Sequence, residues 1–113
     1  MTVPGWSNWT VPPVPSGLSG IADNGQAALT WTASANASSY NVKRATTSGG
    51  PYTTKVSPAT SSYTDTTAVN GTTYYYVVSA VNISGESGNS SQVSATPTTS
   101  LPSPWVTADI GAV

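Results

Sequence analysis

The sequence predicts an all-β sandwich of seven short strands, because two kinds of local signal alternate along it. Apolar and polar residues alternate with a period of two, which is typical of strands buried on one face. Turn-forming residues separate these runs, and no stretch carries the apolar stripe of an amphipathic helix. The turn signals are Asp23-Asn24-Gly25, Ser48-Gly49-Gly50-Pro51, Asn70-Gly71 and Ser84-Gly85.

The first three predicted strands lie in the N-terminal half of the chain. Leu18 and Ile21 indicate an opening strand, which Gly20 interrupts. Residues 26–32 form the first clear strand, and one of its faces consists of Ala27, Leu29 and Trp31. Around residues 40–43, Tyr and Val alternate with Asn and Lys, which predicts the third strand.

Four more strands are predicted in the C-terminal half. Residues 52–56 form a short strand framed by Tyr and Val, and Tyr63 marks the next one before Asp65. The longest strand runs over residues 72–82, and the side chains of one face are Tyr74, Tyr76, Val78 and Ala80. The last strand is indicated by the alternation in residues 92–95.

The charge content of this 113-residue chain is only 6%, whereas globular proteins average about 25%. The basic residues are Lys43, Arg44 and Lys55, and the acidic ones are Asp23, Asp65, Glu86 and Asp109. Nucleic acid and anionic membrane surfaces bind to clusters of cations, so neither is expected as a partner. No run of about 20 apolar residues is present, so no membrane span is expected.

Histidine and cysteine are both absent, which removes the commonest general base, thiolate nucleophiles and most zinc ligands. The carboxylates are the remaining candidates for a glycosidase pair, and Asp23 and Glu86 are expected at the same end of the sandwich. A catalytic acid needs a buried pocket that raises its pKa, however, and Asp23 and Asp65 are better explained as turn caps. We therefore expect no catalytic, cofactor or metal site and no enzymatic activity of the segment itself.

Proline content and periodicity divide the chain into three zones. Residues 1–15 are rich in proline and predict a linker or the tail of a preceding module. Residues 16–97 form the domain, and residues 98–113 predict a second linker followed by the start of another module. The N-terminus has no basic region followed by an apolar stretch, so the signal peptide of a secreted parent is expected upstream.

A set of motifs along residues 15–97 resembles the fibronectin type III family, which implies an immunoglobulin-like form of the sandwich. The motifs are Pro15-Ser-Gly-Leu18, Leu29-Thr-Trp31, Ser39-Tyr-Asn-Val-Lys-Arg44, Tyr63-Thr-Asp65, Asn70-Gly-Thr-Thr-Tyr74 running on to Asn82, Gly85-Glu-Ser87 and Ala95-Thr-Pro97. The loop sequences resemble modules of secreted bacterial carbohydrate-active enzymes, which sit between or after catalytic and carbohydrate-binding modules. The resemblance therefore implies an extracellular or cell-surface location.

By this resemblance, Trp31 is the core tryptophan of the second strand and Tyr74 is the corner tyrosine. The hydroxyl of such a tyrosine forms a hydrogen bond with the backbone a few residues upstream. The family usually has leucine six residues before this tyrosine, and here Ala68 occupies that position. Either Val69 fills the gap, or the corner packs loosely.

Five side chains are candidates for a ligand or partner surface. Alternation places Tyr75, Val77 and Val81 on the outer face of their sheet. An apolar stripe there marks a contact surface, or it reflects β-propensity alone. Trp6 and Trp9 precede the domain, and they either stack on sugar rings or pack against the ends of this domain and its neighbours.

Three functions fit these observations. The first is a spacer or interaction module in a secreted multidomain bacterial glycoside hydrolase or related polysaccharide-active protein, whose partners are neighbouring modules of the same polypeptide. The second is a carbohydrate-binding module that uses the exposed aromatic residues, with polysaccharide as its partner. The third is a cell-surface adhesion or protein-interaction module. A monomer without a cofactor is expected in each case.

Overall fold

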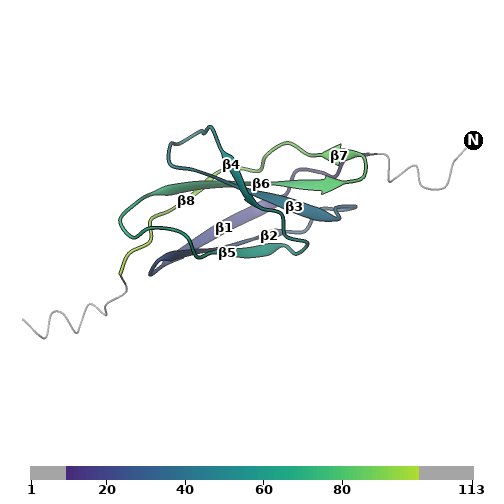
Figure 1. Cartoon of the computed structure of the whole chain (residues 1–113). Coiled ribbons are helices and arrows are strands. Elements are labelled where there is room, and N and C mark those ends of the chain that lie inside the picture. Colours follow the sequence, from purple (N-terminus) through teal and green to yellow (C-terminus); the bar gives the residue numbers. More distant parts are fainter. Residues whose placement is uncertain (1–9, 100–113) are drawn as a thin grey trace, which may run out of the picture.

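The chain folds into two β-sheets that pack face to face, in a computed structural model that describes residues 10–99 (Figure 1). The strands are β1 (Ser16–Asp23), β2 (Gln26–Thr32), β3 (Ser39–Ala45), β4 (Thr53–Val56), β5 (Ser62–Asp65), β6 (Tyr74–Asn82), β7 (Gly85–Glu86) and β8 (Val93–Ala95). Residues 10–99 contain no helix, and hence none long and apolar enough to cross a membrane. The predicted all-β sandwich is confirmed.

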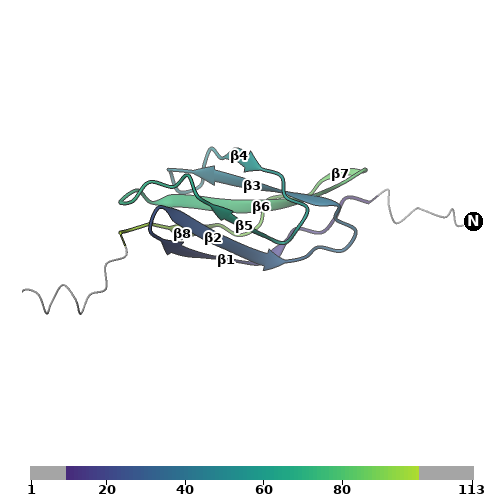
Figure 2. The same ribbon diagram turned by 60° about the horizontal axis from the view of Figure 1, so that its bottom comes forward.

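The two sheets differ in width. The smaller has the strand order β1-β2-β5, and the larger has the order β4-β3-β6-β7, with β8 also paired to β6. Figure 2 shows the two layers from a second direction, with β6 in the interior of the larger sheet. β4 forms one edge of that sheet and packs mainly on its neighbour β3. β4 is therefore an edge strand with two exposed and two half-buried residues.

The core lies between the sheets and follows the predicted alternation. In β2, the buried side chains are Ala27, Leu29 and Trp31, and in β6 the inner face consists of Tyr74, Tyr76, Val78 and Ala80. The Trp31 ring meets the Tyr40 ring of β3 edge to face, with centroids 5.4 Å apart. The predicted core position of Trp31 is confirmed, since only 6% of its surface is exposed.

Two details of the strands differ from the prediction. β1 runs through Gly20 without interruption, and its irregularity lies between Ser16 and Ser19, where Gly17 has a positive φ of 67°. β7 is an additional strand of two residues that pairs with the end of β6. Its segment carries glycine and a turn signal, and such a short strand shows no periodicity in the sequence.

The tyrosine corner is formed as the family resemblance implies. The Tyr74 hydroxyl accepts a hydrogen bond of 2.9 Å from the backbone N–H of Val69. Val69 does not fill the place of the missing leucine, because 59% of its surface is exposed while Ala68 is buried. The Tyr74 ring is instead covered by the Arg44 guanidinium, which lies 4.5 Å from the ring centroid.

The chain enters and leaves the sandwich at opposite ends (Figure 1). At one end, the carbonyl of Thr10 accepts a 2.8 Å hydrogen bond from the side chain of Asn82, the last residue of β6. At the other end, the carbonyl of Pro97 accepts a 2.8 Å bond from Gly71, shortly before β6 begins. Within residues 10–99, the contacts with the sandwich extend upstream to Thr10, whereas the sequence predicts a domain boundary at residue 16.

Candidate functional site

The outer face of the larger sheet carries the predicted surface stripe, but only part of the stripe is accessible. Tyr75 and Val81 are half-buried. Val77 lies between them on the same face of β6 and is only 2% exposed. The expectation that Val77 belongs to an exposed contact surface is therefore wrong.

Side chains that cross β6 explain the burial of Val77. Lys43 lies on β3 directly opposite Val77, and its ammonium reaches across β6 to Glu86 and Asn89, both at 2.8 Å. Nearer the other end of β6, the Tyr52 hydroxyl donates a hydrogen bond to the Gln92 side chain, which precedes β8. The stem of a lysine is apolar and covers neighbouring hydrocarbon well. These two bridges cover an outer face that the alternation rule leaves open to solvent.

Glu86 organises the polar half of this face. Its carboxylate accepts hydrogen bonds from the Ser79 hydroxyl and from the Asn41 amide, the latter at 3.2 Å. The hydrogen bond from Lys43, followed by those from Ser79 and Asn41, lowers the pKa of Glu86 from 4.5 to about 2. Through its Oε2 atom, the carboxylate thus ties β7 to β6 and β3.

The two predicted aromatic residues before the domain, Trp6 and Trp9, lie outside the described residues. Of the five candidate surface residues, the structure therefore leaves Tyr75 and Val81 on a common, partly exposed face. The face around them is largely polar, and it is bonded within itself through Lys43 and Glu86. Of the predicted residues, only the half-buried Tyr75 and Val81 offer apolar surface here to a sugar ring or a partner protein.

A second polar cluster lies inside the sandwich and centres on Asp65, which is completely buried. Its Oδ2 accepts hydrogen bonds from Arg44 at 2.9 Å and from the Tyr76 hydroxyl at 2.7 Å. Its Oδ1 accepts bonds from the backbone and the hydroxyl of Thr67 at 3.0 and 2.7 Å. The cluster joins β5 of the smaller sheet to β3 and β6 of the larger one.

The protonation of this cluster is set by its hydrogen bonds. Burial of the Asp65 carboxyl raises its pKa, but the bonds from its three partners outweigh burial and lower the pKa to about 2. Burial and the adjacent carboxylate raise the pKa of the Tyr76 hydroxyl, which therefore remains a donor. Asp65 does cap the turn to Thr67 as the sequence predicts, but its ion pair with Arg44 was not predicted.

The acidic pair expected at one end of the sandwich, Asp23 and Glu86, lies at its two opposite ends. Asp23 lies at the end where the chain leaves, since its turn bonds to Asn70 through Asn24 and Gly25. Glu86 pairs with Val81 near the opposite end of β6. The expectation that Asp23 and Glu86 share an end is therefore wrong. Within the same residues, no group of three or more acidic side chains gathers as a set of metal ligands.

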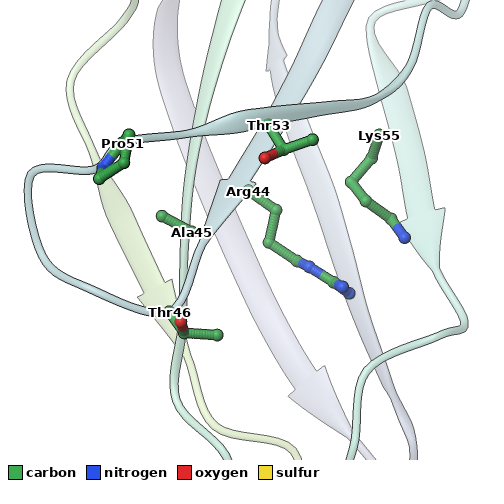
Figure 3. A pocket seen from close by; sticks show the side chains of 6 residues that line it. All are labelled: Arg44, Ala45, Thr46, Pro51, Thr53 and Lys55. Atoms are coloured by element: carbon green, nitrogen blue, oxygen red, sulfur yellow. The ribbon is translucent and has the colours of Figure 1, made fainter.

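A hollow of about 370 Å³ lies along β4, at the edge of the larger sheet. Figure 3 shows its six lining residues, contributed by the end of β3, by β4 and by the loop between them: Arg44, Ala45, Thr46, Pro51, Thr53 and Lys55. The Arg44 and Lys55 side chains extend in the same direction from neighbouring strands (Figure 3). Sequence reasoning missed this hollow because its lining residues carry no common periodic pattern.

Comparison with known proteins identifies relatives along most of the chain, although no family model matches it. An amylopullulanase of Thermoanaerobacter thermohydrosulfuricus is 40% identical over 92 residues, which cover 80% of this chain and 6% of that protein. A poly(3-hydroxybutyrate) depolymerase of Ralstonia pickettii is 46% identical over 85 residues, which cover 73% of this chain and 16% of that protein. The chain thus corresponds to a small part of each of these enzymes.

A solved structure is similar over its whole length. An Fn3-like protein from Clostridium thermocellum superimposes with a TM-score of 0.72 at 45% sequence identity. The match covers 81% of this chain and 99% of that one. The similarity therefore extends to a complete folded unit and is not confined to a single motif.

Proposed function

This chain belongs to the fibronectin type III-like family, and we propose that it is a non-catalytic spacer module of a secreted, multidomain polysaccharide-active protein. The observation that carries this proposal is where the chain enters and leaves the sandwich. Thr10 is bonded to Asn82 at one end of β6, and Pro97 is bonded to Gly71, shortly before the other end. A strand of nine residues is about 26 Å long, so the module holds its neighbours at least this far apart.

The nature of the relatives supports a role that is independent of the substrate. Similar segments occur in an amylopullulanase and in a poly(3-hydroxybutyrate) depolymerase, whose names refer to different polymers. A module shared between such enzymes supplies something both need, and a defined separation between domains is one such property. Since the segment covers only 6% of the amylopullulanase, the chemistry of that enzyme has ample room elsewhere in its chain.

The separation of the ends is measurable, because the chain contains no cysteine and single cysteines can be labelled cleanly. We expect spin labels in the T10C/T98C variant to give one narrow distance distribution at or above about 26 Å. Both positions are exposed; the carbonyl of Thr10 itself accepts the bond from Asn82, and Thr98 directly follows Pro97, whose carbonyl accepts the bond from Gly71. The T30C/T54C variant carries its labels on exposed sites of the two sheets, and its distance distribution gives the reference width for a rigid pair of sites. A distribution much broader than this reference would contradict a rigid spacer.

Titration with neutral oligosaccharides separates the spacer from a carbohydrate-binding module. We expect no heat of binding with maltose-, cellulose-, xylan- or chitin-type oligomers at millimolar concentration, because the predicted contact residues Tyr75 and Val81 are half-buried on the outer face. Clear binding that disappears in Tyr75→Ala, without loss of stability, would replace the spacer proposal with the carbohydrate-binding alternative.

A further inference from the structure

The three cationic side chains, Lys43, Arg44 and Lys55, differ in the ion pairs and hydrogen bonds that they form within residues 10–99. Lys43 is bonded to Glu86 and Asn89 on the outer face. Arg44 uses its Nη1 nitrogen for Asp65 and Thr67, and its other N–H groups form no bond within residues 10–99. Lys55 has no ion-pair partner in this part of the chain. Arg44 and Lys55 thus retain N–H groups that can bind a further anion, and both residues line the hollow along β4.

The walls of this hollow are held in place before any ligand arrives. Arg44 is fixed by Asp65 and by its position over the Tyr74 ring. The loop between β3 and β4 is held by the Gln92 side chain, which bonds to the backbone of Gly49 and to the side chains of Ser48 and Tyr52. A preorganised site loses less free energy to ordering when it binds.

The remaining lining groups match a sugar ring. The hydroxyls of Thr46 and Thr53 form no hydrogen bond among the described residues, and Pro51 and Ala45 supply apolar surface. The volume of about 370 Å³ lies within the range of small-molecule sites, about 300–1,000 Å³. A ligand complementary to the cations, the threonine hydroxyls and the apolar surface is a small molecule that carries a negative charge, hydroxyl groups and an apolar C–H face.

We propose that the hollow is a binding site for the uronic acid residues of acidic polysaccharides. The carboxylate of the sugar lies between Lys55 and the unused N–H groups of Arg44. A ring hydroxyl bonds to Thr53, which lies beside the Arg44 and Lys55 side chains in Figure 3. This site is separate from the spacer geometry, and a failure of either proposal leaves the other intact.

The test is a titration of the 15N-labelled chain with glucuronate, followed by amide shifts of residues 44–55. We expect saturable shifts around the hollow with millimolar affinity, and no such shifts with glucose, which lacks the carboxylate. Lys55→Gln is expected to weaken binding at least fivefold. Lys43→Gln, which removes the same charge from the outer face, is expected to leave the affinity unchanged. Thermal melting of both variants confirms that each remains folded.

Three outcomes would overturn the proposal. Equal shifts with glucose would show that charge is not recognised, and equal affinity for acetate would show that the sugar ring contributes nothing. Equal affinities of the Lys55→Gln and Lys43→Gln variants would place any bound anion outside the hollow. A Thr53→Val variant, nearly the same shape without the hydroxyl, is expected to lose binding two- to threefold, which tests the ring contacts separately.

Discussion

Asp65→Asn is expected to lower the free energy of unfolding by about 3 kcal/mol, a large share of the stability of a small domain. The change keeps the shape of the side chain but removes the negative charge that Arg44 faces at 2.9 Å. The guanidinium is then left partly buried without its partner, which is more costly than losing an ordinary hydrogen bond. Urea denaturation of the two proteins at neutral pH measures the difference.

The same substitution changes how stability depends on pH. The pKa of Asp65 is 3.8 in the unfolded chain and about 2 in the fold, and that of Glu86 falls from 4.5 to about 2. Because the folded pKa values are the lower ones, both groups contribute stability above about pH 4.5 and lose it as the pH falls toward 2. Asp65→Asn removes the contribution of Asp65 to the pH dependence of the free energy of unfolding. The variant therefore loses less stability over this pH interval than the parent chain.

Asp23→Asn is the matched control for this experiment. Asp23 is exposed, and it accepts a hydrogen bond from the following backbone N–H that asparagine also accepts. Its effect on stability is expected to stay within about 0.5 kcal/mol. If Asp65→Asn were equally harmless, the cluster of Asp65, Arg44 and Tyr76 would not hold the two sheets together.

Val77→Lys is expected to destabilise the domain by about 3 kcal/mol, although the alternation of β6 places this residue on the outer face. Val77 is 2% exposed and lies opposite Lys43, so the new ammonium is buried next to a like charge. It also disturbs the path of the Lys43 side chain to Glu86. Denaturation in urea measures the loss.

Val81→Lys provides the comparison, since Val81 lies on the same face of the same strand and is half-buried. We expect it to cost less than about 1 kcal/mol, because a lysine there extends its ammonium into water. Equal effects of the two substitutions would contradict the burial of Val77. The contrast also decides which variant tests a partner surface, since loss of partner binding in Val77→Lys would report unfolding, whereas Val81→Lys and Tyr75→Lys leave the fold in place.

The strands and the core could be predicted because they depend on local alternation. Leu29, Trp31 and Tyr76 are buried as every second residue of a strand, and Tyr74 forms the corner that the family resemblance implies. Which residues of a strand are buried follows from the alternation within that strand, once one of its faces is turned toward the core. No knowledge of distant contacts was needed.

Two of the features that were missed depend on side chains far apart in the sequence. Val77 is buried by bridges such as Lys43 to Asn89, whose residues are 46 positions apart. Asp65 meets Arg44 across 21 positions, and neither residue indicates the other in the sequence. The hollow along β4 was missed for another reason: its lining residues lie within positions 44–55, but the fold of the loop between β3 and β4 brings them together without a periodic pattern.

The chain is bonded close to the two ends of β6 where it enters and leaves the sandwich, and this arrangement has a mechanical consequence. A pull on the polypeptide, as when one flanking domain is anchored on a substrate and another is dragged away, acts parallel to the strands. β1 starts at the end where the chain enters, and β8 ends where the chain leaves, so tension slides each of these strands along its neighbour. Their hydrogen bonds then carry the load together and do not open one after another. The module is arranged to resist stretching along the line through its two ends.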